Sequence, residues 1–134
     1  MLQTANAILV TPNDEIIMQQ RDNKPEIENP GMISFFGGGI ENKETAEQAI
    51  IRELKEELNY EPKIIIKFGV YNKTLAKHGK DVKVNMFLVS NVNVNDSDIR
   101  EGSNYIIISK DDNLNNYNFS KISIEILRDY FKKT

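Results

Sequence analysis

The stretch GGIENKETAEQAIIRELKEELNY, residues 38–60, contains a pattern of charged residues that decides how this chain is interpreted. One glycine and five charged side chains stand in it at fixed offsets: Gly38, Glu44, Arg52, Glu53, Glu56 and Glu57. The last four lie close together on a strongly helical segment, so several carboxylates crowd one small patch. Like charges at short range repel each other unless a cation neutralises them. The stretch therefore predicts a helix that carries a divalent-metal site.

The two ends of this helix are indicated by capping residues. Thr45 is a candidate N-cap, and Gln48 three positions later completes a capping box. Asn59 tolerates the left-handed conformation that often follows the last helical turn, and Pro62 blocks any continuation. We therefore expect the helix to begin after Thr45 and to end near Asn59.

The helix is expected to have an apolar face and an acidic face. Its apolar residues recur with helical spacing: Ala46, Ala49, Ile50, Ile51, Leu54 and Leu58. Glu53, Glu56 and Glu57 share another face, because positions three and four apart are neighbours on a helix. Arg52 is four residues from Glu56, so the two side chains are expected to pair.

The chemistry of these carboxylates indicates magnesium and phosphate. Hard oxygen ligands suit Mg²⁺ or Mn²⁺, and Mg²⁺ often shares the phosphate oxygens of a substrate. The glycines at 37–39 let the backbone approach closely, so a carbonyl can serve as a further ligand. A cation on phosphate oxygens beside a carboxylate that activates water suits phosphoryl hydrolysis. The alternative is a solvated acidic face, but the joint spacing of all six residues favours the metal site.

The composition excludes several classes of function. The 134 residues suit one compact domain, and their hydrophobic share of 40% is ordinary for a globular protein. The net charge of −3 argues against a nucleic-acid-binding surface, and the absence of cysteine excludes disulfides and thiol catalysis. We find no membrane-spanning run and no signal peptide, so we expect a cytoplasmic protein without a membrane partner. The oligomeric state stays open.

Strand-like segments flank the acidic helix on both sides. Alternating or continuous apolar residues mark the segments 5–10, 15–20, 32–36, 63–75, 82–94 and 105–109, of which the last is a candidate buried strand. Residues 77–81 are expected to form a hairpin turn. His78, the only histidine of the chain, is interpreted as a residue of that turn rather than as a catalytic group.

A second amphipathic helix is expected over residues 120–133. Its apolar face should contain Ile124, Leu127 and Phe131. The order of strands, helix, strands and helix favours an α/β fold with a mixed sheet between two helices.

The pattern of residues 38–60 closely resembles the signature of the Nudix hydrolase family. All six residues of the charged pattern match that signature in place. Asn59 and Tyr60 replace its terminal glycine and aliphatic residue, but Asn suits a left-handed C-cap and Tyr60 can still bury its ring. The order of the strands is similar as well. The resemblance therefore implies a single Nudix domain over residues 1–134, an α/β/α sandwich with a mixed β-sheet between helices.

The resemblance also implies roles for the signature residues. The implied ligands of divalent cations are Glu53, Glu56 and Glu57, with a backbone carbonyl of Gly37 or Gly38. Arg52 would orient the glutamates by ion pairing, and Glu44 would support the loop. Glu53 is the expected general base, with Glu57 or a later acidic residue as the alternative.

The implied activity is the Mg²⁺-dependent hydrolysis of a nucleoside diphosphate linked to a further group X. The products would be a nucleotide and X-phosphate, or pyrophosphate when the substrate is a nucleoside triphosphate. The small size resembles the mutator-type triphosphatases more than the larger sugar-nucleotide enzymes. The alternative is a non-catalytic nucleotide-binding or regulatory module, although such members usually lose signature acids. Neither the base, nor the X group, nor the phosphorus that is attacked follows from the signature.

Four residues outside the signature are candidate substrate contacts. Arg21, at the end of the second expected strand, is a candidate for the phosphates, with a surface role as its alternative. At most one of Phe35 and Phe36 is expected to face the core strongly, which makes Phe36 a candidate for the pocket wall, with packing in the core as the favoured alternative. Glu101 sits where some Nudix members carry a further base or ligand. Asn118 lies near where nucleotide-specific members contact the base.

Overall fold

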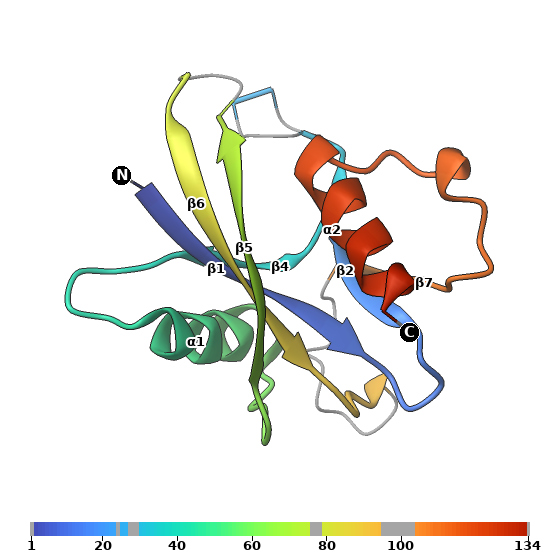
Figure 1. Ribbon diagram of the computed structural model, residues 1–134, viewed down its shortest axis with the longest axis horizontal. Coiled ribbons are helices and arrows are strands. Elements are labelled where there is room, and N and C mark those ends of the chain that lie inside the picture. The colour runs from blue at the N-terminus through green and yellow to red at the C-terminus, as the bar shows by residue number, and fades with distance from the viewer. Residues whose placement is uncertain (1, 24, 27–29, 76–78, 95–103, 134) are drawn as a thin grey trace.

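The computed structural model describes residues 2–23, 25–26, 30–75, 79–94 and 104–133, and Figure 1 shows their arrangement. The strands in these residues are β1 (Leu2–Val10), β2 (Ile16–Gln20), β3 (Ile33–Ser34), β4 (Phe36–Gly39), β5 (Ile66–Thr74), β6 (Asp81–Val89) and β7 (Tyr105–Ile108). The helices are α1 (Ala46–Leu58), the short 3₁₀ helix η2 (Leu114–Asn116) and α2 (Lys121–Lys132). The predicted α/β class is therefore confirmed.

Strand β1 lies at the centre of a mixed sheet in which the order is β3-β2-β1-β6-β5. It runs parallel to β6 along one edge. Along its other edge it pairs first with β4, from Thr4 to Ala7, and then with β2, at Leu9 and Val10. Because β2 and β4 share this edge, they diverge from one another, and the sheet splits between them. Strand β7 pairs with β2 along the edge of β2 that faces away from β1.

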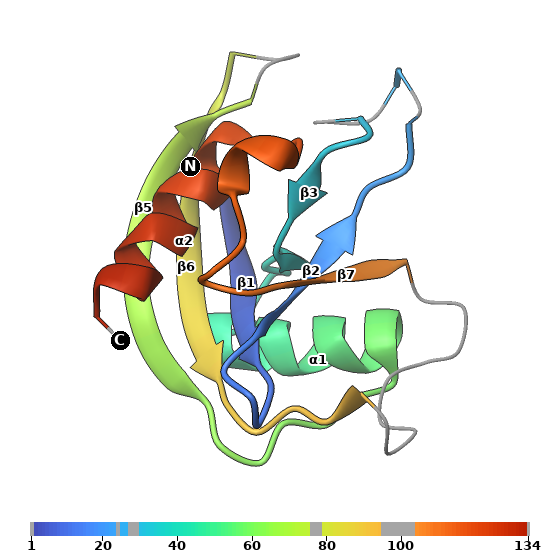
Figure 2. The ribbon, with the colours of Figure 1, turned by 90° about the vertical axis from the view of Figure 1, so that its right-hand side faces the viewer.

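The two helices cover opposite faces of the sheet, as Figure 2 shows. Each helix packs on its own cluster of buried side chains, one centred on α1 and one on α2. The expected arrangement of a mixed sheet between two helices is therefore confirmed. Among the described residues, no helix combines the length and the apolar character needed to cross a membrane.

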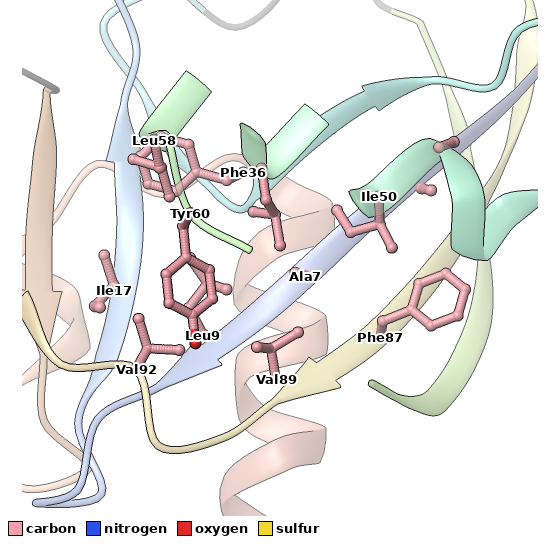
Figure 3. Packing of buried hydrophobic residues seen from close by; sticks show 13 residues of the cluster. Ala7, Leu9, Ile17, Phe36, Ile50, Leu58, Tyr60, Phe87, Val89 and Val92 are labelled. Carbon is pink, nitrogen blue, oxygen red and sulfur yellow. The ribbon is translucent and has the colours of Figure 1, made fainter. Parts of the chain in front are cut away.

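The core beneath α1 follows most of the apolar pattern of the sequence. Figure 3 shows Ile50 and Leu58 on the same side of the sheet as Ala7 and Val89. Tyr60 joins this cluster and is 8% exposed, so the expectation that its ring can be buried is confirmed. The assignment of Ile51 to the apolar face was wrong, because it is 40% exposed and lies outside the contact with the sheet.

The two adjacent phenylalanines before the glycines are both buried, so the expectation that at most one faces the core was wrong. Phe35 is 4% exposed and packs in the α2 cluster, whereas Phe36 is 2% exposed and packs in the α1 cluster. Successive side chains of an extended chain point to opposite faces. Because a helix covers each face of this sheet, both directions lead into a core.

The buried face of α2 differs from the predicted one. Of the three residues predicted to face the core, only Leu127 is fully buried, while Ile124 and Phe131 are partly exposed. The buried residues of α2 are Ser123, Ile126, Leu127 and Tyr130. Tyr130 is held in this orientation by a hydrogen bond from its hydroxyl to Asp14 Oδ1 at 3.2 Å. A polar tip that reaches a partner lets tyrosine occupy a core position, which the apolar pattern does not anticipate.

Two of the predicted strands extend less far than expected. The segments 63–75 and 82–94 contain β5 and β6, which end at Thr74 and Val89. Of the turn between them, residues 76–78 lie outside the described residues, and His78 is among these. Strand β7 matches the segment 105–109, but only Ile108 is fully buried, because β7 pairs with β2 alone.

Candidate active site

Helix α1 is fixed at both ends, as the sequence predicted. Thr45 Oγ1 accepts a hydrogen bond from Gln48 N at 3.1 Å, and Gln48 Oε1 accepts one from Thr45 N at 2.9 Å. Asn59 adopts the left-handed conformation, with φ of 56° and ψ of 33°. The capping box and the C-cap define where the helix begins and ends, and the helix places Glu53 and Glu57 against strand β4.

Strand β4 brings the backbone of two glycines against these carboxylates. Gly37 has φ of 148°, and a Cβ at this position would collide with the carbonyl oxygen of Ala5 in the paired strand. A Cβ on Gly38 would lie 2.5 Å from Glu53 Oε1. Gly37 is therefore required for the pairing of β4 with β1, and Gly38 is required for the close approach of Glu53.

Arg52 connects the loop before α1, the helix itself and strand β4. Its Nε and Nη2 donate to the two carboxylate oxygens of Glu44, at 2.8 and 2.9 Å. Its Nη1 donates to Glu53 Oε1 at 2.9 Å, and its Nη2 also donates to the carbonyl oxygen of Gly39 at 3.0 Å. A guanidinium can make all these bonds at once because its donors are planar and diverge. Arg52 therefore contacts Glu53 directly, which supports its predicted role in orienting a glutamate.

Glu44 holds Arg52 from the loop before the helix. Its Oε1 also accepts a hydrogen bond from the backbone N–H of Glu41 at 2.9 Å. The bonds from Arg52, and then the one from Glu41, lower the pKa of Glu44 to about 2. Glu44 is therefore ionised at neutral pH, and its charge is engaged by Arg52.

Glu57 is the half-buried carboxylate of the site. Its Oε1 accepts from Gly37 N at 3.1 Å and its Oε2 accepts from Gln19 Nε2 at 3.3 Å. Burial, and then the negative charge of Glu53, raise the pKa of Glu57 to about 7, although the Gly37 N–H acts in the opposite direction. Two carboxylates placed together in a partly dry site resist ionising together, and a bound cation would relieve this.

Glu56 lies farther out than the other two glutamates. Its side chain is 60% exposed and its Oε2 lies 3.5 Å from Arg52 Nη1, which confirms the expected pairing of Arg52 with Glu56. Within the described part of the chain, no three His, Cys, Asp or Glu side chains are arranged to hold a metal ion. The donors nevertheless fit a hard cation, because oxygens of Glu53 and Glu57 lie beside the glycine backbone of β4.

Two hollows in the surface adjoin the glutamates. A cavity of about 170 Å³ lies between the sheet and the amino end of α2, and its lining includes Asn6, Gly38 and Met86. A cleft of about 410 Å³ lies beside Glu57. Arg21 lines both hollows, so it stands where they meet next to the acidic residues.

The structure brings only some of the other predicted contacts to this place. Phe36 lines the cleft, but most of its side chain is buried in the α1 cluster. Asn118 lines neither hollow, and its carbonyl oxygen accepts from Ile33 N at 2.8 Å. Glu101 lies outside the described residues. Of the three candidates that the structure describes, Arg21 is the one best placed to meet a substrate.

Three polar residues of the site were missed in the sequence. Gln19 binds Glu57, and Asn6 and Ser34 line the cavity. The signal was present, because Asn6 stands inside the otherwise apolar segment 5–10 and Gln19 follows a run of apolar residues. A polar side chain in a strand covered on both faces needs a partner inside the protein or a ligand.

Comparison with known proteins indicates one family. A family model described as the NUDIX domain matches residues 1–110. An ADP-ribose pyrophosphatase of Methanocaldococcus jannaschii is 34% identical over 64 residues, which are 48% of this chain and 36% of that protein. An 8-oxo-dGTP diphosphatase of Escherichia coli is 41% identical over 61 residues, which are 46% of each protein. The match therefore spans less than half of either curated relative.

Solved structures share the fold over nearly the whole chain. The crystal structure of a MutT protein from Methanosarcina mazei superposes with a TM-score of 0.80 at 18% identity, over 98% of this chain and 93% of that one. The NUDIX domain of Shewanella oneidensis NrtR, complexed with ADP ribose, superposes with a TM-score of 0.73 at 17% identity, over 99% of this chain and 88% of that one. At these identities the likeness concerns the fold.

Proposed function

Because this chain belongs to the Nudix family, we propose that it hydrolyses a phosphoanhydride bond of a nucleotide in a reaction that depends on Mg²⁺. The family match confirms the resemblance in residues 38–60. The proposed substrate is a nucleoside diphosphate linked to a further group, or a nucleoside triphosphate. Hydrolysis would release a nucleotide together with a phosphorylated group or pyrophosphate.

One arrangement supports this proposal above the others. Glu53 and Glu57 lie together against the backbone of Gly37 and Gly38, and Arg52 binds Glu53 directly. This places paired carboxylates beside two hollows that can admit a substrate. A solvated acidic face would not need Gly37 next to Glu57 and Gly38 next to Glu53.

The residues proposed to hold Mg²⁺ are Glu53, Glu56 and Glu57, with a backbone carbonyl of Gly37 or Gly38. Glu56 can turn from Arg52 toward a cation without unpacking the core, because its side chain is largely exposed. When it is bound, Mg²⁺ would supply positive charge to the phosphate oxygens of the substrate. The charge of the cation would also counteract the burial and the repulsion from Glu53 that raise the pKa of Glu57.

We assign the general base to Glu53, whose carboxylate would take the proton of the attacking water. The hydrogen bond from Arg52 Nη1 to Glu53 Oε1 holds this carboxylate in a fixed orientation. Glu57 is the alternative base, because its carboxylate lies beside Glu53 and lines the cleft. Separate Glu53→Gln and Glu57→Gln variants decide between them when kcat is measured at saturating Mg²⁺. Loss of the base lowers kcat even there, whereas loss of a ligand alone raises the Mg²⁺ concentration that is needed.

The two hollows suggest how a nucleotide would be divided over the site. The cavity of about 170 Å³ is smaller than the clefts of ~300–1,000 Å³ that enclose drug-sized ligands, so it suits one ring-sized part, such as a base. Arg21 is a candidate for the phosphates, because it lines both hollows beside Glu57. The names of both curated relatives refer to nucleotide substrates with a phosphoanhydride, which supports this substrate class.

A panel of substrates with product analysis tests the proposal. The purified protein is incubated with Mg²⁺ and nucleoside triphosphates, their 8-oxo forms or ADP-ribose, and the products are separated by chromatography. We expect release of a nucleoside monophosphate from at least one substrate, and none when EDTA replaces Mg²⁺. Binding of a nucleotide without any turnover would instead favour the non-catalytic module.

A further inference from the structure

Asn6 is a partly exposed polar side chain on the wall that the sheet contributes to the cavity, and this cavity is lined by both polar and apolar residues. It lies on β1 and faces the same side of the sheet as Ile8, which belongs to the α2 cluster. Its neighbours on β6 include Met86, which is fully buried in that cluster. An amide at such a position costs free energy unless its donors and acceptor find partners, so its hydrogen bonds require an explanation.

Two contacts fix the orientation of the Asn6 amide. Thr4 Oγ1 donates a hydrogen bond to Asn6 Oδ1 at 2.9 Å. On the other side, Asn6 Nδ2 donates to the carbonyl oxygen of Phe35 at 3.4 Å. A carbonyl can only accept, so the nitrogen must face Phe35 and the oxygen must face Thr4. The amide therefore presents N–H groups, rather than its oxygen, on the side away from Thr4.

These contacts do not use the full donor capacity of the amide. The nitrogen carries two hydrogens, and within the described residues its recorded acceptor is the Phe35 carbonyl, at a distance near the limit of a hydrogen bond. The Thr4 hydroxyl fixes the orientation of the Asn6 side chain. Packing alone does not require this orientation. It is explained if the amide must face a ligand in one direction.

Ser34, in the same cavity, also has a polar group that no described residue satisfies. Its hydroxyl oxygen is buried and has no hydrogen-bond partner among the described residues. Ser34 also lines the cavity that Asn6 lines. A buried hydroxyl without a partner destabilises the protein, and a ligand with polar atoms would remove this cost.

Asn6 is also adjacent to strand β4, which contacts the proposed catalytic carboxylates. It is the strand partner of Gly37, and the N–H of Gly37 donates to Glu57 Oε1 at 3.1 Å. A Cβ at position 37 would lie 2.6 Å from Asn6 Nδ2, so glycine is needed there for the amide as well. A group bound by Asn6 in the cavity would therefore lie next to the carboxylates proposed to act on the phosphates.

We propose that Asn6, oriented by Thr4, determines which base the protein accepts by donating a hydrogen bond to an acceptor atom of that base in the cavity. The acceptor is a carbonyl oxygen or a ring nitrogen, and Ser34 contacts a further polar atom of the same ligand. This inference rests on the proposed function, because it concerns the binding of the substrate of that reaction. Asn6 contributes to specificity and not to the chemical step.

Steady-state kinetics of Asn6→Asp with the panel of nucleotides test the inference. This substitution keeps the shape and the acceptor for Thr4 but removes the N–H donors. We expect KM for the preferred substrate to rise about ten-fold, the scale of one lost hydrogen bond, while kcat changes by less than about two-fold. The order of preference among the bases should also change. Ser34→Ala should raise KM in the same direction.

Asn85→Asp is the matched control. Asn85 is a buried strand amide that binds Gln3 Oε1 and the Thr4 carbonyl oxygen, and it does not line the cavity. It should lower the melting temperature without changing the order of preference among bases. If Asn6→Asp and Asn85→Asp had the same effect on both readouts, Asn6 would be structural and the inference would be wrong.

The two proposals fail in different ways in this experiment. If the wild-type protein neither binds nor hydrolyses any nucleotide of the panel, the proposed function fails, and the inference fails with it. If the wild-type protein is active and Asn6→Asp keeps both KM and the order of preference, only the inference fails. Where Asn6→Asp lowers the melting temperature below the assay temperature, Thr4→Val serves instead, and the same change in the order of preference is expected.

Discussion

Glu44 accepts two parallel hydrogen bonds from the guanidinium of Arg52, at 2.8 and 2.9 Å, and so ties the loop before α1 to the second turn of that helix. The remaining guanidinium nitrogen, Nη1, points at Glu53 Oε1. Glu44 thus acts on Glu53 through Arg52. Because the two residues form a fork-to-fork pair, the position of the guanidinium is fixed more tightly than a single ion pair would fix it.

Replacing Arg52 by lysine should keep the positive charge but lose the set of hydrogen bonds to Glu44 and Glu53. A lysine ammonium cannot make the paired bonds to Glu44 and reach Glu53 at the same time. We expect the hydrolytic rate to fall by about 10- to 100-fold, the scale seen when residues that orient metal ligands are removed. The measurement is kcat for the preferred nucleotide at saturating Mg²⁺. A rate close to that of the wild-type protein would show that the charge alone suffices.

The pair of Glu44 with Arg52 also makes stability depend on pH. The pKa of Glu44 is about 2 in the folded protein, below its ordinary value of 4.5. A lowered pKa in the folded state stabilises the fold above the ordinary value, and this contribution is lost as the pH falls toward the folded value. The difference in urea midpoint between the wild-type protein and Glu44→Gln should therefore be constant above about pH 4.5 and shrink below it.

Glu47→Gln is the control for this titration, because Glu47 is an exposed acid in the first turn of the same helix. It lacks the paired bonds to Arg52, so its difference from the wild-type protein should be small throughout. A Glu44→Gln difference that persists undiminished toward pH 2 would contradict the assignment.

Replacing either of two neighbouring glycines by alanine should affect kcat very differently. A Cβ on Gly38 would lie 2.5 Å from Glu53 Oε1, whereas a Cβ on Gly39 meets nothing within 4 Å. Gly38→Ala should therefore displace Glu53 and lower kcat by at least about ten-fold. Gly39→Ala should leave kcat within about two-fold of the wild-type value. Circular dichroism checks that both variants are folded, and equal activity of the two would refute the role of Gly38.

Binding of Mg²⁺ should raise the melting temperature through Glu57. A cation that binds only the folded state stabilises it in proportion to the logarithm of its concentration. We expect the melting temperature of the wild-type protein to rise with added MgCl₂, and Glu57→Gln to reduce this rise by more than half. Glu47→Gln, which changes the net charge equally, should keep it. An identical rise in all three proteins would indicate non-specific screening.

The sequence predicted those parts of the structure that depend on local contacts. The capping box of Thr45 and Gln48 and the left-handed Asn59 are set within a few residues of the chain, and both occur as expected. The pairing of Arg52 with Glu56 depends only on helical spacing, and it occurs as well. The α/β architecture followed from the order of strand-like and helix-like segments.

The features that the sequence did not predict depend on packing between distant segments. Phe35 and Phe36 are both buried because helices far apart in the chain cover the two faces of the sheet. Ile51 is exposed because the sheet lies against a narrower face of α1 than the apolar pattern indicated. Gln19 binds Glu57 only because the strand pairing brings β2 beside the helix end. No periodicity within a single segment contains this information.

Steady-state hydrolysis of the preferred nucleotide by the wild-type protein and by Glu53→Gln tests whether Glu53 acts as the general base. The two proteins should have melting temperatures within a few degrees of each other, because Gln keeps the shape of the side chain and can still accept from Arg52. If Glu53 is the general base, Glu53→Gln lowers kcat by about 100-fold or more at saturating Mg²⁺, the scale of removing such a base. A Glu53→Gln protein that hydrolyses the nucleotide at the wild-type rate would contradict this assignment.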